Sequence, residues 1–248
     1  MKLRGLIAGL TSVGALFGML MAVPLPADGA PGSGRAIMPT SIRKVVPKKM
    51  TNYGSGVWGG PAAGVSRSGD LATADVLLVG DSIGNRCTAD IRAALLLKGL
   101  TLATITQSGQ NAEGLVDLLL NEAVVPERVL MEAGTNNVFE PPTIAPQISR
   151  VQNWAADNAI SIKWVDTYVG RPTTALADAR NSGWVNSYIY SAVPFQDIIK
   201  WQAALGAAVG RGKSLSLYLE DGVHPWINAG TGHADGCAFY AAIVAAGI

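Results

Sequence analysis

Short apolar runs alternate with segments of helical spacing from Ala74 to the end of the chain. We expect the runs to be strands at VLLVG (76–80), Thr101–Thr106, RVLMEAG (128–134), Ile160–Val165 and Ser214–Leu219. A continuous apolar run ended by a turn is typical of a strand that is buried on both faces. Strands that alternate with helices predict a parallel sheet with helices on both sides. The expected fold class is therefore α/β, with three α/β/α layers.

The intervening segments predict the positions of the helices. Helices are expected at Thr88–Lys98, Ala112–Asn121, Ile148–Asn158, Phe195–Val209 and His233–Ala246, and irregular structure at Gly170–Ser191. In such folds the functional loops follow the carboxyl ends of the strands. Polar and glycine residues of chemical interest do follow the predicted strands, namely Ser82, Gly109, Asn136 and His224.

The first residues have the features of an export signal. Lys2 and Arg4 precede Leu6–Val23, which is uncharged and mostly apolar, and prolines and small residues follow. This pattern predicts a signal peptide over residues 1–29 and a secreted or cell-envelope protein. The apolar run is near the lower limit for spanning a bilayer and contains three glycines, so we expect no membrane span after cleavage.

The remainder divides into two parts by composition. Residues 30–72 are rich in Gly, Pro, Ser and basic side chains, which indicates an extension without a core of its own. Residues 73–248 carry the alternating pattern and form the expected main domain. We expect this protein to be a monomer.

Charge and motif content exclude several function classes. The net charge of the 248-residue chain is +1, which gives no electrostatic basis for binding nucleic acid. The sequence has no Cys, His and carboxylate cluster at metal-ligand spacing and no Walker-type phosphate loop. We therefore expect no nucleic-acid partner, no metal and no cofactor.

The two cysteines, Cys87 and Cys237, have two interpretations. In an oxidising compartment an even count of cysteines predicts a disulfide, here one that ties the end of the chain to the region after Ser82. The alternative is a pair of buried thiols that behave as small apolar side chains.

The stretch VGDSIGNRC contains G-x-S-x-G at Gly80, Ser82 and Gly84, the pattern of an exposed serine nucleophile. Acyl transfer by serine also needs a base, an acid that orients the base, and donors for the oxyanion. The chain has two histidines, His224 and His233, and both follow Ser82, which excludes a chymotrypsin-like order.

The stretch EDGVHPW places Asp221 shortly before His224. A tight turn at Gly222 would let the Asp221 carboxylate reach one ring nitrogen of His224 and leave the other to face Ser82. The sequence thus predicts a Ser82–His224–Asp221 triad.

Four blocks resemble the motifs of the SGNH, or GDSL-type, hydrolases. They are Gly80-Asp81-Ser82, the glycine Gly109 in QSGQNAEGL, Gly134-Thr135-Asn136-Asn137 and Asp221 to His224, in the order and spacing of that family. The resemblance covers residues 74–248 and implies a flavodoxin-like sheet. The family usually has aspartate where this chain has Asn137, a departure that bears on loop rigidity more than on chemistry.

The resemblance also implies the role of each residue. Ser82 is the nucleophile, His224 the general base and then acid, and Asp221 the residue that orients His224. The oxyanion hole combines the N–H groups of Ser82 and Gly109 with the side-chain amide of Asn136. An amide suits this role because it stays neutral and donates at any working pH.

Each of these residues also has a simpler structural interpretation. Ser82 is a candidate helix N-cap, and Asp221 and Asn136 are residue types common in turns. Gly114 lies close enough in sequence to take the place of Gly109.

The sequence as a whole predicts a secreted serine esterase that hydrolyses short-chain esters, acetyl esters among them, on a small molecule, glycan or lipid. Two alternatives remain open: an O-acyltransferase with the same site, and a non-catalytic carbohydrate-binding or envelope module on this scaffold.

Overall fold

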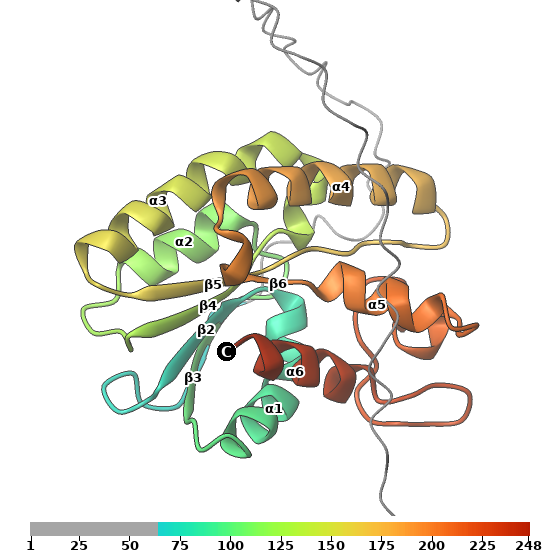
Figure 1. The fold of residues 1–248 in the computed structure, drawn as a ribbon, viewed down its shortest axis with the longest axis horizontal. Helices are drawn as coiled ribbons and strands as arrows, with labels where there is room; N and C mark the ends of the chain where they lie inside the picture. The colour runs from blue at the N-terminus through green and yellow to red at the C-terminus, as the bar shows by residue number, and fades with distance from the viewer. Residues whose placement is uncertain (1–63) are drawn as a thin grey trace, which may run out of the picture. The chain divides into compact units, whose positions relative to one another are not determined.

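The computed structural model describes residues 64–248, and a six-stranded sheet lies at the centre of this part (Figure 1). The strands are β1 (Ser66–Ser68), β2 (Val76–Gly80), β3 (Leu102–Thr106), β4 (Arg128–Glu132), β5 (Ser161–Val165) and β6 (Ile198–Ile199). Their order is β1-β3-β2-β4-β5-β6, with β2 to β6 parallel and β1 antiparallel to β3. The five parallel strands follow the flavodoxin-like order, so the expected fold class is confirmed.

Helices cover both faces of the sheet. They are α1 (Ser82–Leu96), α2 (Ala112–Leu120), α3 (Ile144–Asp157), α4 (Ala175–Ala192), α5 (Trp201–Val209) and α6 (Gly236–Gly247), with short 3-10 helices η1 (Thr135–Phe139), η2 (Pro141–Thr143), η3 (Phe195–Asp197) and η4 (Leu215–Leu217). Figure 1 shows α2, α3 and α4 on one side of the sheet and α1, α5 and α6 on the other. None of the helices within residues 64–248 has both the length and the apolar character needed to cross a membrane.

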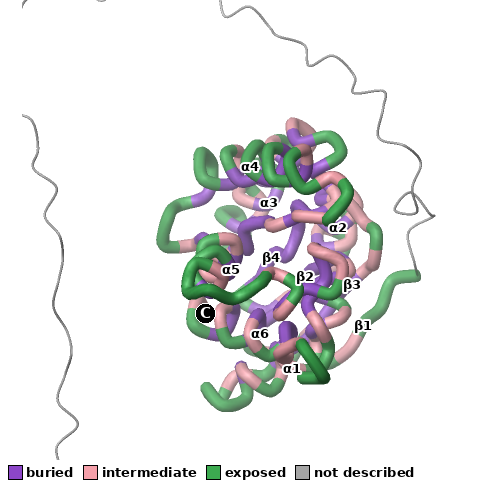
Figure 2. The backbone as a smooth tube through the Cα atoms, turned by 90° about the vertical axis from the view of Figure 1, so that its right-hand side faces the viewer, coloured by how far each residue is buried: buried purple, intermediate pink, exposed green. Residues whose placement is uncertain are grey.

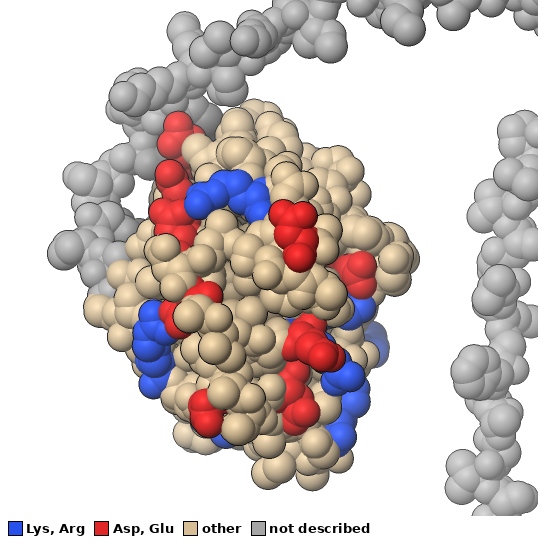
Figure 3. Space-filling view, turned by 90° about the vertical axis from the view of Figure 1, so that its left-hand side faces the viewer, with Lys and Arg blue, Asp and Glu red and all other residues tan. Residues whose placement is uncertain are grey.

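The core lies between these layers. Every residue of β2 and β3 is buried, as the apolar run VLLVG predicts for a strand with helices on both faces. In Figure 2 the buried positions follow the sheet and the inner faces of the helices, while the outer faces and loops are exposed. In Figure 3, Lys and Arg lie in small groups among Asp and Glu on the face shown.

The expected signal peptide, residues 1–29, lies outside the described residues, as does most of the expected 30–72 extension. Within the described end of that extension, Ser66–Ser68 forms the edge strand β1. The domain boundary near residue 73 stays a prediction.

The expectation of irregular structure at Gly170–Ser191 is wrong, because α4 occupies most of it. The inner face of α4 buries polar side chains at Asp178, Asn181, Ser182 and Asn186. Ser182 accepts a hydrogen bond from Val169 N–H and Asn186 one from Thr167 N–H. The helix therefore faces the β5–α4 loop without the apolar spacing that reveals most helices.

The expected last strand at Ser214–Leu219 is also wrong. This segment forms η4, with Ser214 as its N-cap, and only Leu219 takes part in an isolated bridge, with Pro225. The last strand is instead β6, two residues within the predicted helix Phe195–Val209. A strand that short has no detectable alternation in sequence.

Candidate active site

The turn from β2 into α1 exposes Ser82. The N-cap of α1 is Asp81, whose Oδ1 accepts a hydrogen bond from Ile83 N–H at 3.0 Å. Ser82 is therefore the first helical residue and not the cap, which removes its simpler interpretation. The N–H of Ser82 lies in the first turn of the helix, where the helix itself supplies no acceptor.

The loop before α6 folds as the predicted tight turn. Asp221 Oδ1 accepts hydrogen bonds from the N–H groups of Val223 at 2.9 Å and His224 at 2.8 Å. Gly222 has φ +83°, and a Cβ there would lie 2.2 Å from the carbonyl oxygen of Gly170. Only glycine fits this turn without strain.

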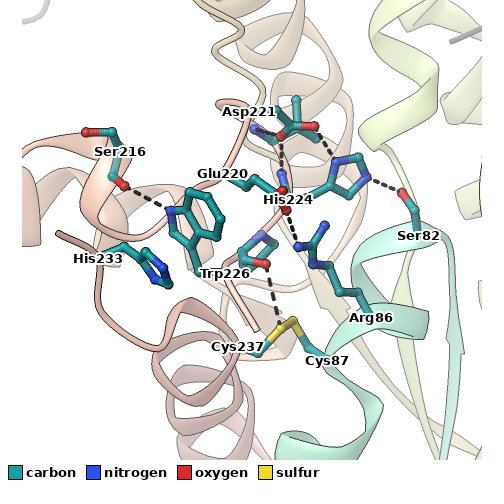
Figure 4. Close-up of polar contacts among 12 residues, drawn as sticks. Ser82, Arg86, Cys87, Ser216, Glu220, Asp221, His224, Trp226, His233 and Cys237 are labelled. Atoms are coloured by element: carbon teal, nitrogen blue, oxygen red, sulfur yellow. Dashed lines mark hydrogen bonds and ion pairs between the residues drawn. A yellow bond between two sulfur atoms is a disulfide. The ribbon is translucent and has the colours of Figure 1, made fainter. Parts of the chain in front are cut away.

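This turn brings the histidine and its acid together. Asp221 Oδ2 lies 2.8 Å from His224 Nδ1 (Figure 4). Partial burial acts to raise the pKa of the Asp221 carboxyl, but hydrogen bonds from the ring and backbone of His224 outweigh it and hold that pKa below its usual range. The ionised carboxylate favours the His224 tautomer with its proton on Nδ1.

The second ring nitrogen faces the serine. His224 Nε2 lies 2.8 Å from Ser82 Oγ, a contact between residues that are 142 positions apart in sequence (Figure 4). With the proton on Nδ1, Nε2 accepts from the serine hydroxyl. The structure thus brings together all three residues of the predicted triad.

Asn136, which is expected to donate to the oxyanion through its side chain, lies in η1 after β4. Its Nδ2 donates to Gln110 O at 2.9 Å and to Asp81 Oδ2 at 3.2 Å. Both amide hydrogens thus have protein acceptors, and an oxyanion would share the hydrogen that makes the longer bond to Asp81.

Of the two candidate glycines, the geometry favours Gly109. Gly114 lies within α2 and its N–H donates to Asn111 Oδ1 at 3.1 Å. Gly109 lies in the loop after β3, with φ +80°, a conformation that favours glycine. Gly109 directly precedes Gln110, whose carbonyl oxygen accepts the hydrogen bond from Asn136 Nδ2.

Asn137, the departure from the family pattern, is buried and bonds to two loops. Its Oδ1 accepts from Ala112 N–H at 2.9 Å and its Nδ2 donates to Thr143 Oγ1 at 2.8 Å. The amide therefore connects η1 to the start of α2 and to η2, so the loop rigidity does not depend on an aspartate here.

The predicted disulfide is present between Cys87 and Cys237. It joins α1, which carries Ser82, to the start of α6. Arg86 forms an ion pair with Glu220, the residue before Asp221 (Figure 4). The nucleophile helix is thus connected to the His224 loop at two places.

A small hollow lies beside Asn136. Its volume is about 10 Å³, and it is lined by Thr135, Asn136, Val138, Phe139, Val169, Arg171 and Val223. Its three valines form an apolar part of the wall, and its size suits one small group. Sequence reasoning identified Asn136 but missed Val138, Phe139, Val169, Arg171 and Val223, because these come from separate segments of the chain. It also missed Glu132, although an acid at the end of the apolar run RVLME is itself an unusual signal.

Among residues 64–248, no group of three or more His, Cys, Asp and Glu side chains is placed to hold a metal ion.

Comparisons with known proteins bear on the fold. No protein-family model matches the sequence, and no curated protein is detectably similar in sequence. An acetyl xylan esterase, AlAXEase, superposes with a TM-score of 0.52 at 15% identity, over 70% of this chain and 98% of that one. Axe2, an acetylxylan esterase from Geobacillus stearothermophilus, gives a TM-score of 0.50 at 13% identity, over 71% and 94%. At these identities the likeness establishes a shared fold.

Proposed function

We propose that this chain, with the three-layer fold of the SGNH hydrolases, is a serine esterase that forms an acyl-enzyme on Ser82. The observation that carries the proposal is the continuous chain from Ser82 Oγ to His224 Nε2 and from His224 Nδ1 to Asp221, with both contacts at 2.8 Å. Such an arrangement activates a hydroxyl that is otherwise a weak nucleophile.

The reaction has two stages. Ser82 Oγ attacks the ester carbonyl while His224 Nε2 takes its proton, and the Asp221 carboxylate stabilises the imidazolium that forms. The oxyanion accepts hydrogen bonds from the N–H groups of Ser82 and Gly109 and from the Asn136 amide, and one such donor lowers the barrier by about 3 kcal/mol. His224 then protonates the departing alcohol, and water, activated by the same ring, releases the acid.

The proposed substrate is an acetyl ester, carried by a glycan or a small molecule. The hollow beside Asn136 is the size of one small apolar group. Two proteins that share the fold are named as acetylxylan esterases, which is consistent with acetyl esters of a polysaccharide.

We also propose that the protein is exported. The basic and apolar start of the sequence supports this, and so does the Cys87–Cys237 disulfide, since disulfides persist in oxidising compartments. The proposed locations are the cell envelope and the medium.

Labelling with a fluorophosphonate probe tests the proposed nucleophile. We expect one adduct, on the peptide that contains Ser82, and none in the Ser82→Ala variant. An unlabelled wild-type protein would instead favour a non-catalytic module on this scaffold. Product analysis with and without a glycan acceptor then separates hydrolysis from transfer to a sugar hydroxyl, which would use the same acyl-enzyme.

The hollow predicts the acyl-length preference. Each additional methylene that does not fit costs about 1–3 kcal/mol, so we expect wild-type kcat/KM to be at least tenfold higher for acetate than for butyrate esters. Val169 is a buried wall residue of the hollow, and Val169→Ala should reduce that preference severalfold. Rates with p-nitrophenyl acetate and butyrate measure it.

Val151→Ala is the matched control, because Val151 is equally buried but lies in α3, away from the hollow. It should leave the ratio of the two rates unchanged. If Val169→Ala also leaves that ratio unchanged, the hollow does not hold the acyl group.

A further inference from the structure

The two outer glycines of G-x-S-x-G make room for a carboxyl group. A Cβ at Gly80 or at Gly84 would lie 3.0 Å from Glu132 Oε2 in each case. Glu132 is the last residue of β4 and pairs with Gly80 across the sheet. Its side chain therefore lies between the two glycines, beneath the turn that presents Ser82.

Glu132 binds the backbone of this turn directly. Its Oε2 accepts hydrogen bonds from Asp81 N–H and Gly84 N–H, both at 2.9 Å. These two residues flank Ser82 and Ile83 in sequence. Glu132 is 4% exposed, so water does not compete for these bonds.

Asp81 extends the network to the oxyanion side of the site. Its Oδ1 accepts from Ile83 N–H at 3.0 Å and its Oδ2 from Asn136 Nδ2 at 3.2 Å. Asp81 is fully buried and its carboxyl interacts directly with that of Glu132 and with the Thr135 side chain. Two buried carboxyls in contact cannot both be ionised at neutral pH, because like charges repel strongly in a low dielectric.

The hydrogen bonds decide which carboxyl keeps the proton. Asp81 receives donors at both of its oxygens and lies near His224, which acts to lower the pKa of the Asp81 carboxyl. Burial raises the pKa of Glu132 well above its usual value, and the neighbouring Asp81 raises it further; the N–H groups of Asp81 and Gly84 oppose that rise, but both donate to the same oxygen, Oε2. Burial also raises the pKa of Asp81, but hydrogen bonds from Ile83 and Glu132 oppose that rise.

We propose that Glu132 is a positioning residue: protonated at neutral pH, it donates to the Asp81 carboxylate, and this one-proton pair fixes the Ser82 turn and the Asn136 amide relative to each other. The proposal goes beyond the triad and rests on the proposed esterase function for its kinetic consequence. Removing the shared proton at alkaline pH would place a second negative charge beneath the oxyanion site.

Among residues 64–248, two further titratable groups interact with the pair: His224 from the loop before α6, and Tyr240 from α6, whose own pKa burial raises well above its usual value. Ionised Tyr240 would add to the repulsion in the same pH direction. Tyr240 is present in wild type and in every Glu132 variant, so its contribution is the same in each.

Two substitutions at Glu132 test the proposal. Glu132→Leu removes the acceptor for Asp81 N–H and Gly84 N–H and the donor to Asp81, and we expect kcat to fall at least 30-fold with little change in KM. Glu132→Gln keeps both the acceptor and the donor, so it should restore kcat to within about threefold of wild type. Wild-type kcat/KM should decline at alkaline pH as the pair loses its shared proton, and Glu132→Gln should remove that decline. A Gln variant as inactive as the Leu variant, or one that keeps the wild-type alkaline decline, would overturn the proposal.

A stability measurement tests the proton without using activity. In the unfolded chain Glu132 ionises near its ordinary pKa of about 4.3. Above that pH and below the raised folded pKa, the folded state holds one proton more, so its stability falls as pH rises. The ratio of the folding equilibrium constant of Glu132→Gln to that of wild type should therefore increase about tenfold per pH unit in this window. A constant difference between the two would overturn the shared proton even if the protein has no esterase activity.

Discussion

Replacing Ser82 by alanine is expected to lower kcat/KM for p-nitrophenyl acetate by about 10⁴–10⁶-fold, and His224→Ala should have an effect of the same size. The reason is that the two groups act as one unit: without Nε2 the hydroxyl keeps its proton, and without Oγ the base has nothing to activate. Their 2.8 Å contact also predicts that the double variant will be little worse than either single variant. Steady-state rates of the three proteins measure this.

The other histidine provides a matched control. His233 stacks on Trp226, with ring centroids 4.1 Å apart, and lies well apart from Ser82 in Figure 4. His233→Ala should keep nearly full activity. Thermal unfolding of each variant shows whether the fold is intact, and Ser82→Ala should unfold near the wild-type temperature, because Asp81 and not Ser82 caps α1. Activity retained by both Ser82→Ala and His224→Ala would refute the proposed mechanism.

The sheet could be predicted from the sequence because its central strands are buried on both faces. Such strands are continuous apolar runs, and VLLVG and RVLME leave no other assignment once helical segments separate them. Helix α4 could not be predicted in the same way. Asp178, Asn181 and Asn186 are buried because they hydrogen-bond to loop backbone, at sequence separations of 7, 43 and 19 residues, and such partners leave no helical spacing in the sequence.

The site residues that could be predicted from the sequence are likewise those that belong to local motifs. Ser82, His224 and Asp221 belong to recognisable short motifs, and the turn at Gly222 brings the last two together by local geometry alone. Glu132 was not identified, since its partners at Asp81 and Gly84 are reached through strand pairing. The glycines of G-x-S-x-G were visible in the sequence, but the carboxyl group they accommodate was not.

The Cys87–Cys237 disulfide leads to the second large expected effect. The two cysteines are 150 residues apart in sequence, so the bridge restricts much of the unfolded chain. The double variant Cys87→Ala/Cys237→Ala should lose about 2–5 kcal/mol of stability, by the chain-entropy account. For a domain of this size that is a fall in Tm of roughly 4–20 °C. Alanine is the right replacement, because both sites are fully buried and a serine hydroxyl would need a partner.

The bridge should also matter for the triad, because Cys237 contacts the residues that follow His224. Its N–H donates to Trp226 O at 2.9 Å, and its sulfur lies 3.9 Å from Pro225 O. We therefore expect esterase activity to disappear at a lower temperature in the double variant than in the wild type, in step with the lower Tm. Treatment with a reductant is the internal control: it should lower the wild-type Tm to that of the double variant and leave the double variant unchanged. Alkylation of both thiols would show that the wild-type protein is reduced. If that protein still unfolds at the temperature of the oxidised form, the disulfide does not have this role. The Arg86–Glu220 pair and the packing of α1 on α6 would then suffice to hold the His224 loop.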